Sequence, residues 1–320
     1  MRVFRTIPAR ADIPIALTIG NFDGVHLGHQ AMLERLRREA AARALPAAVM
    51  TFEPHPREFF APDQAPTRLS SLREKLETLA ALGVDRAYVC RFSYDLARTP
   101  PEAFVERVLV RGLSVRWLLV GDDFRFGARR AGDLTLLQSL AAAGGYVVNS
   151  ISSVTVGGRR VSSTAIRAAL AEGDLDLATQ LLGRPYSISG RVIGGDRLGR
   201  TLGFPTANIR MRHNRPPLQG IFAVRVYGIG SSALAGAASL GVRPTIHAHG
   251  APTLEVHVLD FDRDIYGRHV RVEFLRKLRA EQKFSDVETL RKQIARDVDE
   301  TRLFFAGPAA AAGGAGQRGR

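Results

Sequence analysis

The sequence predicts an α/β domain with a parallel sheet, followed by a small antiparallel β-barrel with a closing C-terminal helix. The length of 320 residues is about twice that of a typical domain, which favours two domains. Up to about residue 184, short apolar runs alternate with segments of helical spacing, as in parallel α/β sheets. Beyond that point, the period-two alternation of antiparallel strands takes over. We therefore predict domains at 1–184 and 185–306 and a disordered tail at 307–320.

In the first domain, five apolar runs are expected to form strands that are buried on both faces of the sheet. They span residues 15–20, 47–52, 86–92, 115–121 and 146–151. Between them, apolar residues recur every three or four positions at 32–36, 72–80, 104–108 and 134–140, which predicts helices. Strands that alternate with helices in this way form a doubly wound sheet.

In the second domain, five short segments alternate apolar and polar residues, and turn residues separate them. They span residues 188–193, 221–227, 235–240, 254–259 and 270–275. One long helix is predicted at 285–304, with Ser285 as its N-cap and Glu288 completing a capping box. This pattern indicates a small barrel or sandwich. The Ala/Gly-rich tail has no apolar period and is expected to be disordered.

The composition excludes several classes of protein. The single cysteine, Cys90, excludes an intramolecular disulfide and a cysteine-based zinc site, and it fits the reducing cytoplasm. The apolar runs are too short to cross a bilayer, and Asp12 and two prolines interrupt the N-terminal stretch where a secretory signal would be apolar. We therefore expect a cytoplasmic protein that does not bind membranes.

The net charge of +14 is the one unusual number. Between residues 185 and 250, eight arginines face a single acidic residue, Asp196. Such an excess can mark a nucleic-acid surface. However, only four of the 45 basic residues are lysine, and dominance of arginine can equally reflect coding bias. The charge alone therefore leaves nucleic-acid binding open.

The first predicted strand leads into Gly20-Asn21-Phe22-Asp23-Gly24-Val25-His26-Leu27-Gly28-His29 and then into a helix. Ligands of open α/β sheets bind beyond the carboxyl ends of the strands, and a helix N-terminus after a Gly-rich turn suits an anion. Two histidines at this point can donate hydrogen bonds to phosphate oxygens. The alternative is a pair of polar loop histidines at a helix cap.

Two more segments suit phosphate at the same edge of the sheet. The segment 120–127 follows the fourth strand. Ser162-Ser163-Thr164-Ala165-Ile166-Arg167 follows the fifth and offers hydroxyls at a helix start, with an arginine one turn in. Each segment alone is an ordinary turn or cap, but three on one edge favour a nucleotide site.

These three segments together resemble the adenylyltransferase module of bacterial bifunctional riboflavin kinase/FAD synthetases, and the resemblance runs from about residue 3 to 305. It implies a Rossmann-like nucleotidylyltransferase domain in which His26 and His29 act on the phosphates of ATP. It further implies nucleotide contacts at Gly20, Phe22, Asp23, Gly24, Gly28, Asp123, Ser163, Thr164 and Arg167. Asp123 would lie near the adenine and ribose, where relatives often have asparagine. In the matching segment 51–56, His55 could seat substrate, but a proline-rich turn is the simpler interpretation.

A second segment, residues 190–208, concentrates glycines and arginines, which suit close backbone approach to phosphate and bidentate bonds. Taken alone, it reads as a flexible basic hairpin. The downstream barrel resembles the family's riboflavin kinase module, which makes this segment the ATP loop, and Thr206 and Asn208 would face Mg²⁺. The nucleotide contacts implied are Gly194, Gly199, Arg200, Gly203 and Pro205.

In the segment 253–259, apolar residues face one way, so Glu255 and His257 share the opposite face. The ordinary interpretation is a solvated strand face. The resemblance instead aligns Glu255 with the family's glutamate base, and it places Gly241-Val242-Arg243-Pro244-Thr245 in the wall of the flavin pocket.

The predicted function is therefore phosphorylation of riboflavin to FMN by ATP in the barrel, and adenylylation of FMN to FAD with release of pyrophosphate in the first domain. Mg²⁺, ATP and flavins are the expected cofactor and substrates, and no nucleic acid is required. The main alternative is a different H-x-G-H nucleotidylyltransferase with an appended basic, RNA-binding barrel. A class I aminoacyl-tRNA synthetase shares the H-x-G-H pair, but no Lys-rich second signature loop is present. Oligomeric state is left open.

Overall fold

The computed structural model describes the chain except for residues 196–197, 213–214, 243–251 and 308–320. Contacts divide it into two compact units. The first comprises residues 1–66 and 72–163, and the second comprises 67–71 and the chain from residue 164 onward. Helix α8 (Leu175–Leu182) and nearly all of α7 (Ser163–Glu172) therefore group with the barrel. The tail predicted to be disordered lies, beyond Gly307, outside the described residues.

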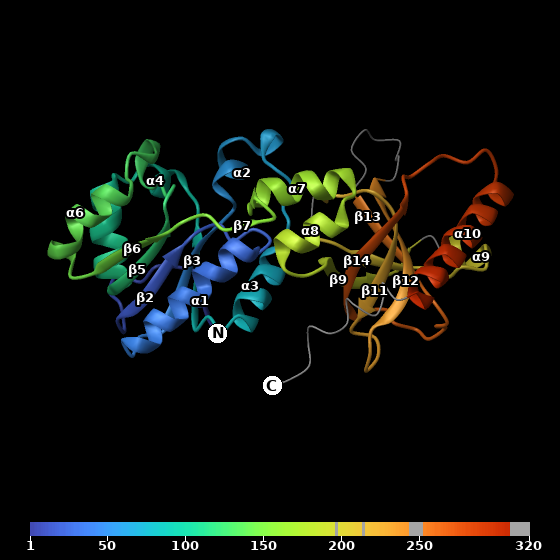
Figure 1. Cartoon of the computed structure of the whole chain (residues 1–320), viewed down its shortest axis with the longest axis horizontal. Coiled ribbons are helices and arrows are strands. Elements are labelled where there is room, and N and C mark those ends of the chain that lie inside the picture. The colour runs from blue at the N-terminus through green and yellow to red at the C-terminus, as the bar shows by residue number, and fades with distance from the viewer. Residues whose placement is uncertain (196–197, 213–214, 243–251, 308–320) are drawn as a thin grey trace. The chain divides into compact units, whose positions relative to one another are not determined.

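The first unit is built on a six-stranded sheet in the order β1-β4-β3-β2-β5-β6, in which every pairing is parallel. Figure 1 shows it as the blue-to-green half of the chain. Its strands are β1 (Arg2–Phe4), β2 (Ile15–Ile19), β3 (Ala47–Glu53), β4 (Arg86–Arg91), β5 (Val115–Gly121) and β6 (Val147–Ile151). The parallel sheet and its five long strands confirm the predicted fold. The short edge strand β1 was not predicted.

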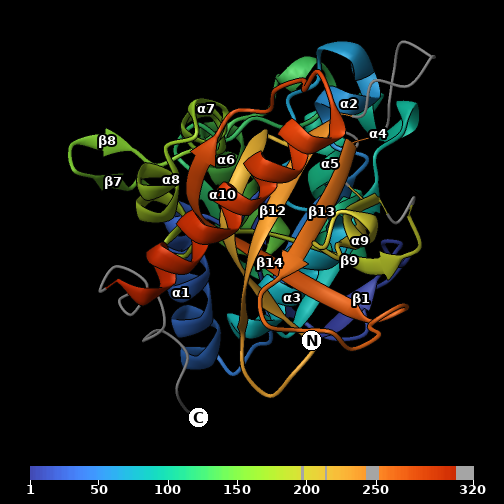
Figure 2. The same cartoon turned by 90° about the vertical axis from the view of Figure 1, so that its right-hand side faces the viewer.

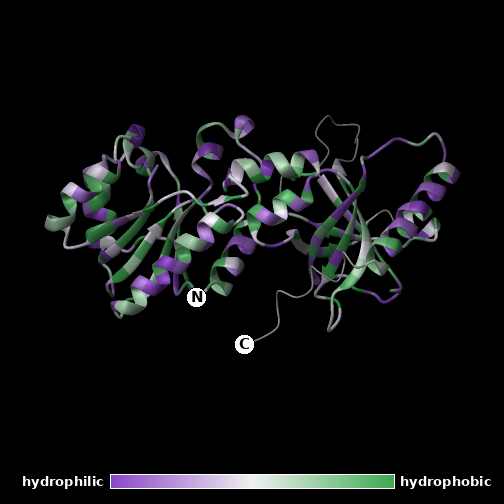
Figure 3. Cartoon of the chain, in the orientation of Figure 1, coloured by the Kyte–Doolittle hydropathy of each residue, from purple (hydrophilic) through white to green (hydrophobic). Residues whose placement is uncertain are grey.

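Helices cover both faces of this sheet. One apolar cluster joins strand residues to α1 (Leu27–Ala42) and α3 (Leu72–Ala81). The other joins them to a π-helical turn (Val105–Gly112) and α6 (Leu134–Gly144). Figure 3 shows the apolar strands between helices that are polar on their outer sides. The short elements are α2 (Pro56–Phe60), η1 (Pro62–Gln64), α4 (Tyr94–Arg98), α5 (Pro101–Phe104), η3 (Ala128–Arg130), β7 (Thr155–Val156) and β8 (Arg159–Arg160).

The second unit contains a closed antiparallel barrel in the order β10-β13-β12-β11-β14-β9. Its strands are β9 (Tyr186–Ile193), β10 (Ala207–Arg210), β11 (Gly220–Tyr227), β12 (Leu234–Val242), β13 (Pro252–Val258) and β14 (His269–Arg279). Alternate residues of β9 and β13 are buried, which is the period of two expected for a barrel wall. The short helix α9 (Leu198–Thr201) lies between β9 and β10. Helix α10 (Val287–Ala306) crosses the outside of the barrel over β11, β12 and β14 (Figure 2).

The N-cap of α10 differs from the prediction. Asp286 is the N-cap, and its carboxylate accepts a hydrogen bond of 2.8 Å from the Thr289 backbone N–H. Ser285 instead donates its hydroxyl to Asp286 at 2.7 Å. The predicted Ser285–Glu288 capping box is therefore wrong, because the helix starts one residue later and an aspartate is there to cap it.

The cap of α10 predicts a pH dependence of stability. Bonds from the Thr289 backbone and from the Ser285 and Thr289 hydroxyls lower the pKa of Asp286 to about 2. Because the folded pKa lies below that of the unfolded chain, this stabilisation is complete above about pH 4 and is lost as the pH falls toward 2. We expect Asp286→Ala to lower the melting temperature of the barrel at pH 7. The difference in melting temperature between the wild type and this variant should become smaller as the pH falls from 5 to 2. If calorimetry gave the same difference in melting temperature at every pH in that range, the assignment of Asp286 as the cap would be wrong.

None of the helices in the described part of the chain is long and apolar enough to cross a membrane. The longest, α10, has charged residues along its whole length.

Candidate functional site

The loop after β2 turns sharply over a buried phenylalanine. Phe22, Gly24 and Val25 have positive φ angles of 49°, 79° and 41°, and Phe22 is fully buried. A Cβ at Gly20 would lie 3.1 Å from the Phe22 ring, so glycine allows the chain to pass close over it. The turn delivers the chain to the N-terminus of α1 at the carboxyl edge of the sheet, where the predicted histidines begin.

His26 is the N-cap of α1, and His29 lies one turn into the helix. The Nδ1 atom of His26 accepts a hydrogen bond of 3.4 Å from the His29 backbone N–H. The two imidazole rings stack with their centroids 3.7 Å apart. A Cβ at Gly28 would lie 3.2 Å from the His26 ring, so this position also favours glycine. The sequence motif therefore forms one compact imidazole pair.

The imidazole of His29 is electrostatically unusual. Burial, and then the positive charges of His26 and Lys75, hold the pKa of His29 well below its usual value of 6.5. Its Nδ1 atom is buried and has no hydrogen-bond partner among the residues that the structure describes. At neutral pH, His29 is therefore an uncharged imidazole that can donate a hydrogen bond but carries no charge of its own.

Two other predicted residues lie at the same edge of the sheet. The Ser163 hydroxyl donates to the backbone carbonyl of Asp23 at 2.9 Å, which ties the start of α7 to the loop after β2. Asp123 follows β5, the neighbour of β2, and its exposed carboxylate pairs with Arg160 at 2.8 Å. Thr164 and Arg167 belong to the second unit, where Arg167 Nε donates to the carbonyl of Thr67 at 2.5 Å.

His55 has a local structural role. The Nδ1 atom of its ring accepts a hydrogen bond of 3.1 Å from the Arg57 backbone N–H. The backbone N–H of His55 donates to the Glu58 carboxylate at 3.3 Å. These bonds form the capping box of α2. They agree with the interpretation of residues 51–56 as a turn.

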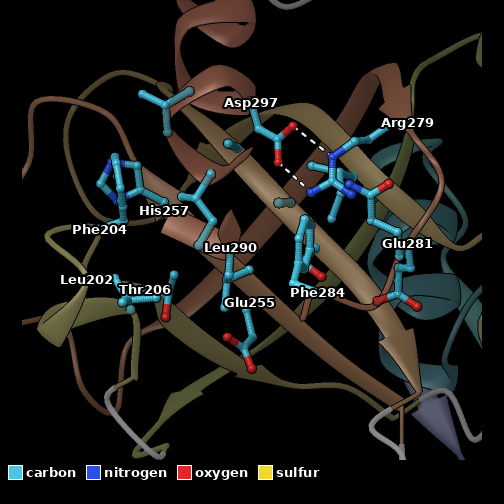
Figure 4. A pocket seen from close by; sticks show the side chains of 18 of the residues that line it. Leu202, Phe204, Thr206, Glu255, His257, Arg279, Glu281, Phe284, Leu290 and Asp297 are labelled. Atoms are coloured by element: carbon cyan, nitrogen blue, oxygen red, sulfur yellow. Dashed lines mark hydrogen bonds and ion pairs between the residues drawn. The ribbon is translucent and has the colours of Figure 1, made fainter. Parts of the chain in front are cut away.

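A cavity of about 500 Å³ lies between the outer face of the barrel and α10 (Figure 4). Glu255 of β13 is directly opposite Asn208 of β10 and also directly opposite Ser239 of β12. Side chains at opposed positions of antiparallel strands lie on the same face. All three residues line the cavity, together with Thr206 and His257. The barrel register therefore brings the predicted base and the predicted metal-facing residues together.

The loop between β9 and β10 lies against these side chains. A Cβ at Gly195 would collide with the Asn208 amide, and one at Gly199 would collide with the carbonyl of Phe204 and lie 3.1 Å from Thr206 Oγ1. Gly203 has a φ of +87°, which favours glycine. Gly199 lines the cavity, whereas Gly194 and Arg200 are exposed beside it. Asp196 and Arg197 of the same loop lie outside the described residues.

The crowding at Gly199 predicts the effect of a single methyl group. Gly199→Ala should displace the Phe204 carbonyl and Thr206 and, in the riboflavin kinase reaction predicted from the sequence, lower kcat/KM for ATP by up to about 10²-fold, because small misplacements of a positioning group are costly. Gly230→Ala is the matched control, since the nearest atom to a Cβ there is 3.6 Å away. Equal kinetics for the two variants would show that the close approach is unimportant.

His257 holds the end of this loop. Its Nδ1 atom lies 2.9 Å from the carbonyl oxygen of Pro205, and its ring meets Phe204 edge-on at 5.6 Å. The shared face of Glu255 and His257 predicted from the sequence is therefore the wall of the cavity, rather than a solvated surface. Of the predicted flavin wall, Arg243, Pro244 and Thr245 lie outside the described residues.

Sequence reasoning missed the other end of the cavity. Arg279 of β14 forms a bidentate ion pair with Asp297 of α10, at 2.9 and 2.7 Å, and Gln293 donates to the same carboxylate at 3.0 Å. Partial burial raises the pKa of Glu281, although a Ser239 hydrogen bond acts against this. Asp297 is buried on α10 together with Val298 and Thr301, and only the packing of this helix on the barrel shows that it faces Arg279.

Comparison with known proteins identifies both halves of the chain. Residues 9–165 match the family model of FAD synthetase, and residues 182–305 match that of riboflavin kinase. The bifunctional riboflavin kinase/FMN adenylyltransferase of Escherichia coli (strain K12) is 49% identical over 308 residues, which cover 95% of this chain and 98% of the relative. The chain belongs to the bifunctional riboflavin kinase/FMN adenylyltransferase family. The member from Haemophilus influenzae is 47% identical over 290 residues, or 91% of this chain and 94% of the relative.

A solved structure is similar to this chain over most of its length. A crystal structure described as a macrolide-efflux protein from Streptococcus pneumoniae superposes with a TM-score of 0.81 and 27% sequence identity, and it covers 94% of this chain and 99% of its own. Family membership confirms the predicted pair of activities, riboflavin kinase and FMN adenylyltransferase. Because the riboflavin kinase model covers the barrel, the alternative of an unrelated RNA-binding barrel is no longer needed.

Proposed function

We propose that the barrel cavity makes FMN from riboflavin and ATP, and that the H-x-G-H edge of the parallel sheet converts FMN to FAD with a second ATP. The observation that carries the proposal is the row Asn208–Glu255–Ser239, which the barrel register sets side by side in a cavity large enough for a ligand. We also propose the division of these activities between residues 1–184 and 185–306.

In the kinase reaction, Glu255 accepts the proton of the ribityl 5′-hydroxyl as that oxygen attacks the γ-phosphate of ATP. A carboxylate within reach of the acceptor hydroxyl is the usual base for such a step. The loop that carries Gly194, Gly199, Arg200 and Gly203 binds the phosphates through backbone N–H groups and a guanidinium group. Phe204, Phe284 and Leu290 give the cavity an apolar wall that suits a flavin ring.

The donor set beside Glu255 fits Mg²⁺. Thr206 and Asn208 present hard oxygen atoms next to a carboxylate, and Mg²⁺ commonly takes one or two protein ligands while phosphates and waters complete its shell. The described residues contain no cluster of three or more His, Cys, Asp or Glu that could hold a metal ion by itself. The ion would neutralise charge on the transferred phosphoryl group. Thr206 and Asn208 would hold and orient it.

In the adenylyltransferase reaction, an FMN phosphate oxygen attacks the α-phosphate of ATP, and pyrophosphate leaves. No protein nucleophile is needed, because positioning and charge stabilisation suffice. His26 and His29 donate to the reacting phosphate at the N-terminus of α1, where the backbone N–H groups also favour an anion. Gly20, Phe22, Asp23, Gly24 and Gly28 shape this loop.

The remaining contacts of the adenylyltransferase site are proposed from the family motif. Ser163, Thr164 and Arg167 would bind phosphate, and Asp123 would lie near the adenine and ribose. Ser163 and Asp123 both lie at the carboxyl edge of the sheet, which supports this assignment. A buried single cysteine, Cys90, supports a cytoplasmic setting.

One incubation tests the function. Purified chain is mixed with riboflavin, ATP and Mg²⁺, and the flavins are separated by chromatography. FMN and then FAD should appear, pyrophosphate should accompany FAD, and EDTA should stop both steps. If neither flavin product forms, the proposed function fails. If, in addition, the chain binds RNA with steep salt dependence, the barrel is a nucleic-acid surface instead.

A further inference from the structure

His257 is a half-buried histidine that neither proposed reaction uses. It lies on β13 two residues after Glu255, so both side chains point to the same side of the barrel wall. Both line the cavity between the barrel and α10. In Figure 4, the imidazole lies at the end of the cavity that holds Phe204 and Thr206. A polar ring at this place needs a hydrogen-bond partner, and its partner is a backbone group.

The imidazole continues the contact between two strands beyond the point where their pairing ends. The pairing of β10 with β13 begins at Ala207, which is opposite Val256. Pro205, two residues before Ala207, has no N–H and cannot donate to a neighbouring strand. Its carbonyl oxygen still accepts, and the Nδ1 atom of His257 lies 2.9 Å from it. Because a carbonyl oxygen cannot donate, this contact requires the imidazole proton on Nδ1.

The same ring contacts the residue before Pro205. His257 meets Phe204 edge-on, with the ring centroids 5.6 Å apart. The Phe204 backbone N–H in turn donates to the Gly199 carbonyl at 2.8 Å, and a Cβ at Gly199 would collide with the Phe204 carbonyl. His257 therefore holds two successive residues of a tightly folded loop, and Thr206 is the next residue along the chain.

The two residues proposed to face Mg²⁺ are fixed in different ways. Asn208 lies within β10, directly opposite Ile193 of β9 and Glu255 of β13, so the barrel register fixes it from both sides. Thr206 precedes the first residue of β10, and its position depends on how the end of the loop is anchored. A side chain that anchors the two preceding residues therefore also sets the place of the Thr206 hydroxyl.

We propose that His257 is a positioning residue of the kinase site: the hydrogen bond from its Nδ1–H to the Pro205 carbonyl holds the Thr206 hydroxyl where Mg²⁺ and the phosphates of ATP bind. His257 acts through this loop and contacts neither the substrates nor the metal. The inference rests on the proposed kinase reaction and adds a residue to it.

The test compares three substitutions of His257 in the full chain. Asparagine carries its amide nitrogen on Cγ, as histidine carries Nδ1, so His257→Asn keeps a donor near that position. His257→Leu has the same branching without a donor, and His257→Gln carries its donor one bond further out. His269→Leu is the matched control, because His269 lies at the start of β14 and does not line the cavity.

Three kinds of measurement separate positioning from loss of structure. Calorimetric titration gives the affinity for ATP with and without Mg²⁺, and flavin fluorescence gives the affinity for riboflavin. Kinetics give kcat/KM for ATP and the Mg²⁺ concentration for half-maximal FMN formation. Nitrogen-15 NMR of the chain without ligands shows which imidazole nitrogen of His257 carries the proton, and the spectrum of His257→Asn assigns the signal.

In the wild type, the proton should be found on Nδ1. His257→Leu and His257→Gln should lower kcat/KM for ATP on the order of 10²-fold, the cost of misplacing a positioned group by about 1 Å, and should need more Mg²⁺. They should bind ATP more weakly only when Mg²⁺ is present, and they should bind riboflavin with unchanged affinity. His257→Asn should retain most of the activity, and His269→Leu all of it.

A double substitution tests whether His257 acts through Thr206. Thr206→Val removes the hydroxyl and keeps the shape of the side chain. Adding His257→Leu to Thr206→Val should lower kcat/KM for ATP little further, because the effects of coupled residues do not add. Full additivity of the two effects would overturn the proposed route.

The proposal is also overturned if His257→Leu keeps the wild-type kinetics and Mg²⁺ dependence, if His257→Asn is as impaired as His257→Leu, or if the proton lies on Nε2 alone. Equal weakening of riboflavin and ATP binding would make His257 a structural residue of the barrel, which overturns it as well. Should His257→Leu fail to fold, His257→Gln decides, because it keeps a polar side chain. Failure of the wild-type chain to make FMN would instead overturn the proposed function, while the NMR result would still test the hydrogen bond.

Discussion

Glu255→Gln should lower the rate of FMN formation by about 10²–10⁴-fold, the usual contribution of a general base. The amide keeps the size of the side chain in its place between Asn208 and Ser239 but cannot accept the proton of the flavin hydroxyl. Supplied FMN should still become FAD at the wild-type rate. The measurement is flavin chromatography with riboflavin and, separately, with FMN as substrate.

Glu273→Gln is the matched control for this variant. Glu273 is a β14 residue that accepts a hydrogen bond from Tyr227 at 2.9 Å and does not line the cavity. Its substitution should leave FMN formation unchanged. If Glu255→Gln kept wild-type kinase activity, or lost both activities together, the assignment of the base would be wrong.

His29→Ala should have the opposite outcome, with riboflavin converted to FMN that then accumulates. Removal of one hydrogen-bond donor from a charged transition state lowers kcat by about 10²–10³-fold. The variant also removes a ring that stacks on His26 and packs on Phe22. Circular dichroism should therefore be used to check that its helix content matches that of the wild type. Time courses of FMN and FAD measure the effect.

The kinase step is the internal control for His29→Ala. An undiminished rate of FMN formation shows that the barrel is intact and that the supply of FMN does not limit FAD. Wild-type FAD formation by this variant would remove His29 from the mechanism. A parallel loss of FMN formation would mean that the two sites are not independent.

The long elements of the fold could be predicted because their periodicity is local. The five strands predicted between residues 15 and 151 are buried on both faces and are therefore apolar throughout. The five strands predicted in the barrel are buried on one face, so apolar and polar residues alternate in them. Strand β1 has only three residues and gains its strand geometry from pairing with β4. Strand β10 has only four residues, too few for its apolar and polar alternation to stand out, and only pairing with β9 and β13 defines it.

Site residues could be predicted where they lie close together in the sequence, within one motif. They were missed where only the packing of distant elements brings them together. The pair His26 and His29 lies within one helical turn, so its proximity could be read from the sequence. Arg279 and Asp297 meet only because α10 crosses the barrel. The N-cap at Asp286 depended on a choice between two adjacent capping residues, which local propensity does not separate.

The central claim is that one chain contains two independent nucleotide sites, and mixing two disabled variants tests it most directly. Glu255→Gln and His29→Ala are incubated with riboflavin, ATP and Mg²⁺, first separately and then together. The first alone should leave riboflavin unchanged, the second alone should stop at FMN, and the mixture should make FAD, because FMN released by one protein is used by the other. If the mixture makes no FAD while the wild-type chain does, the two reactions do not occur at separable sites and the account is wrong.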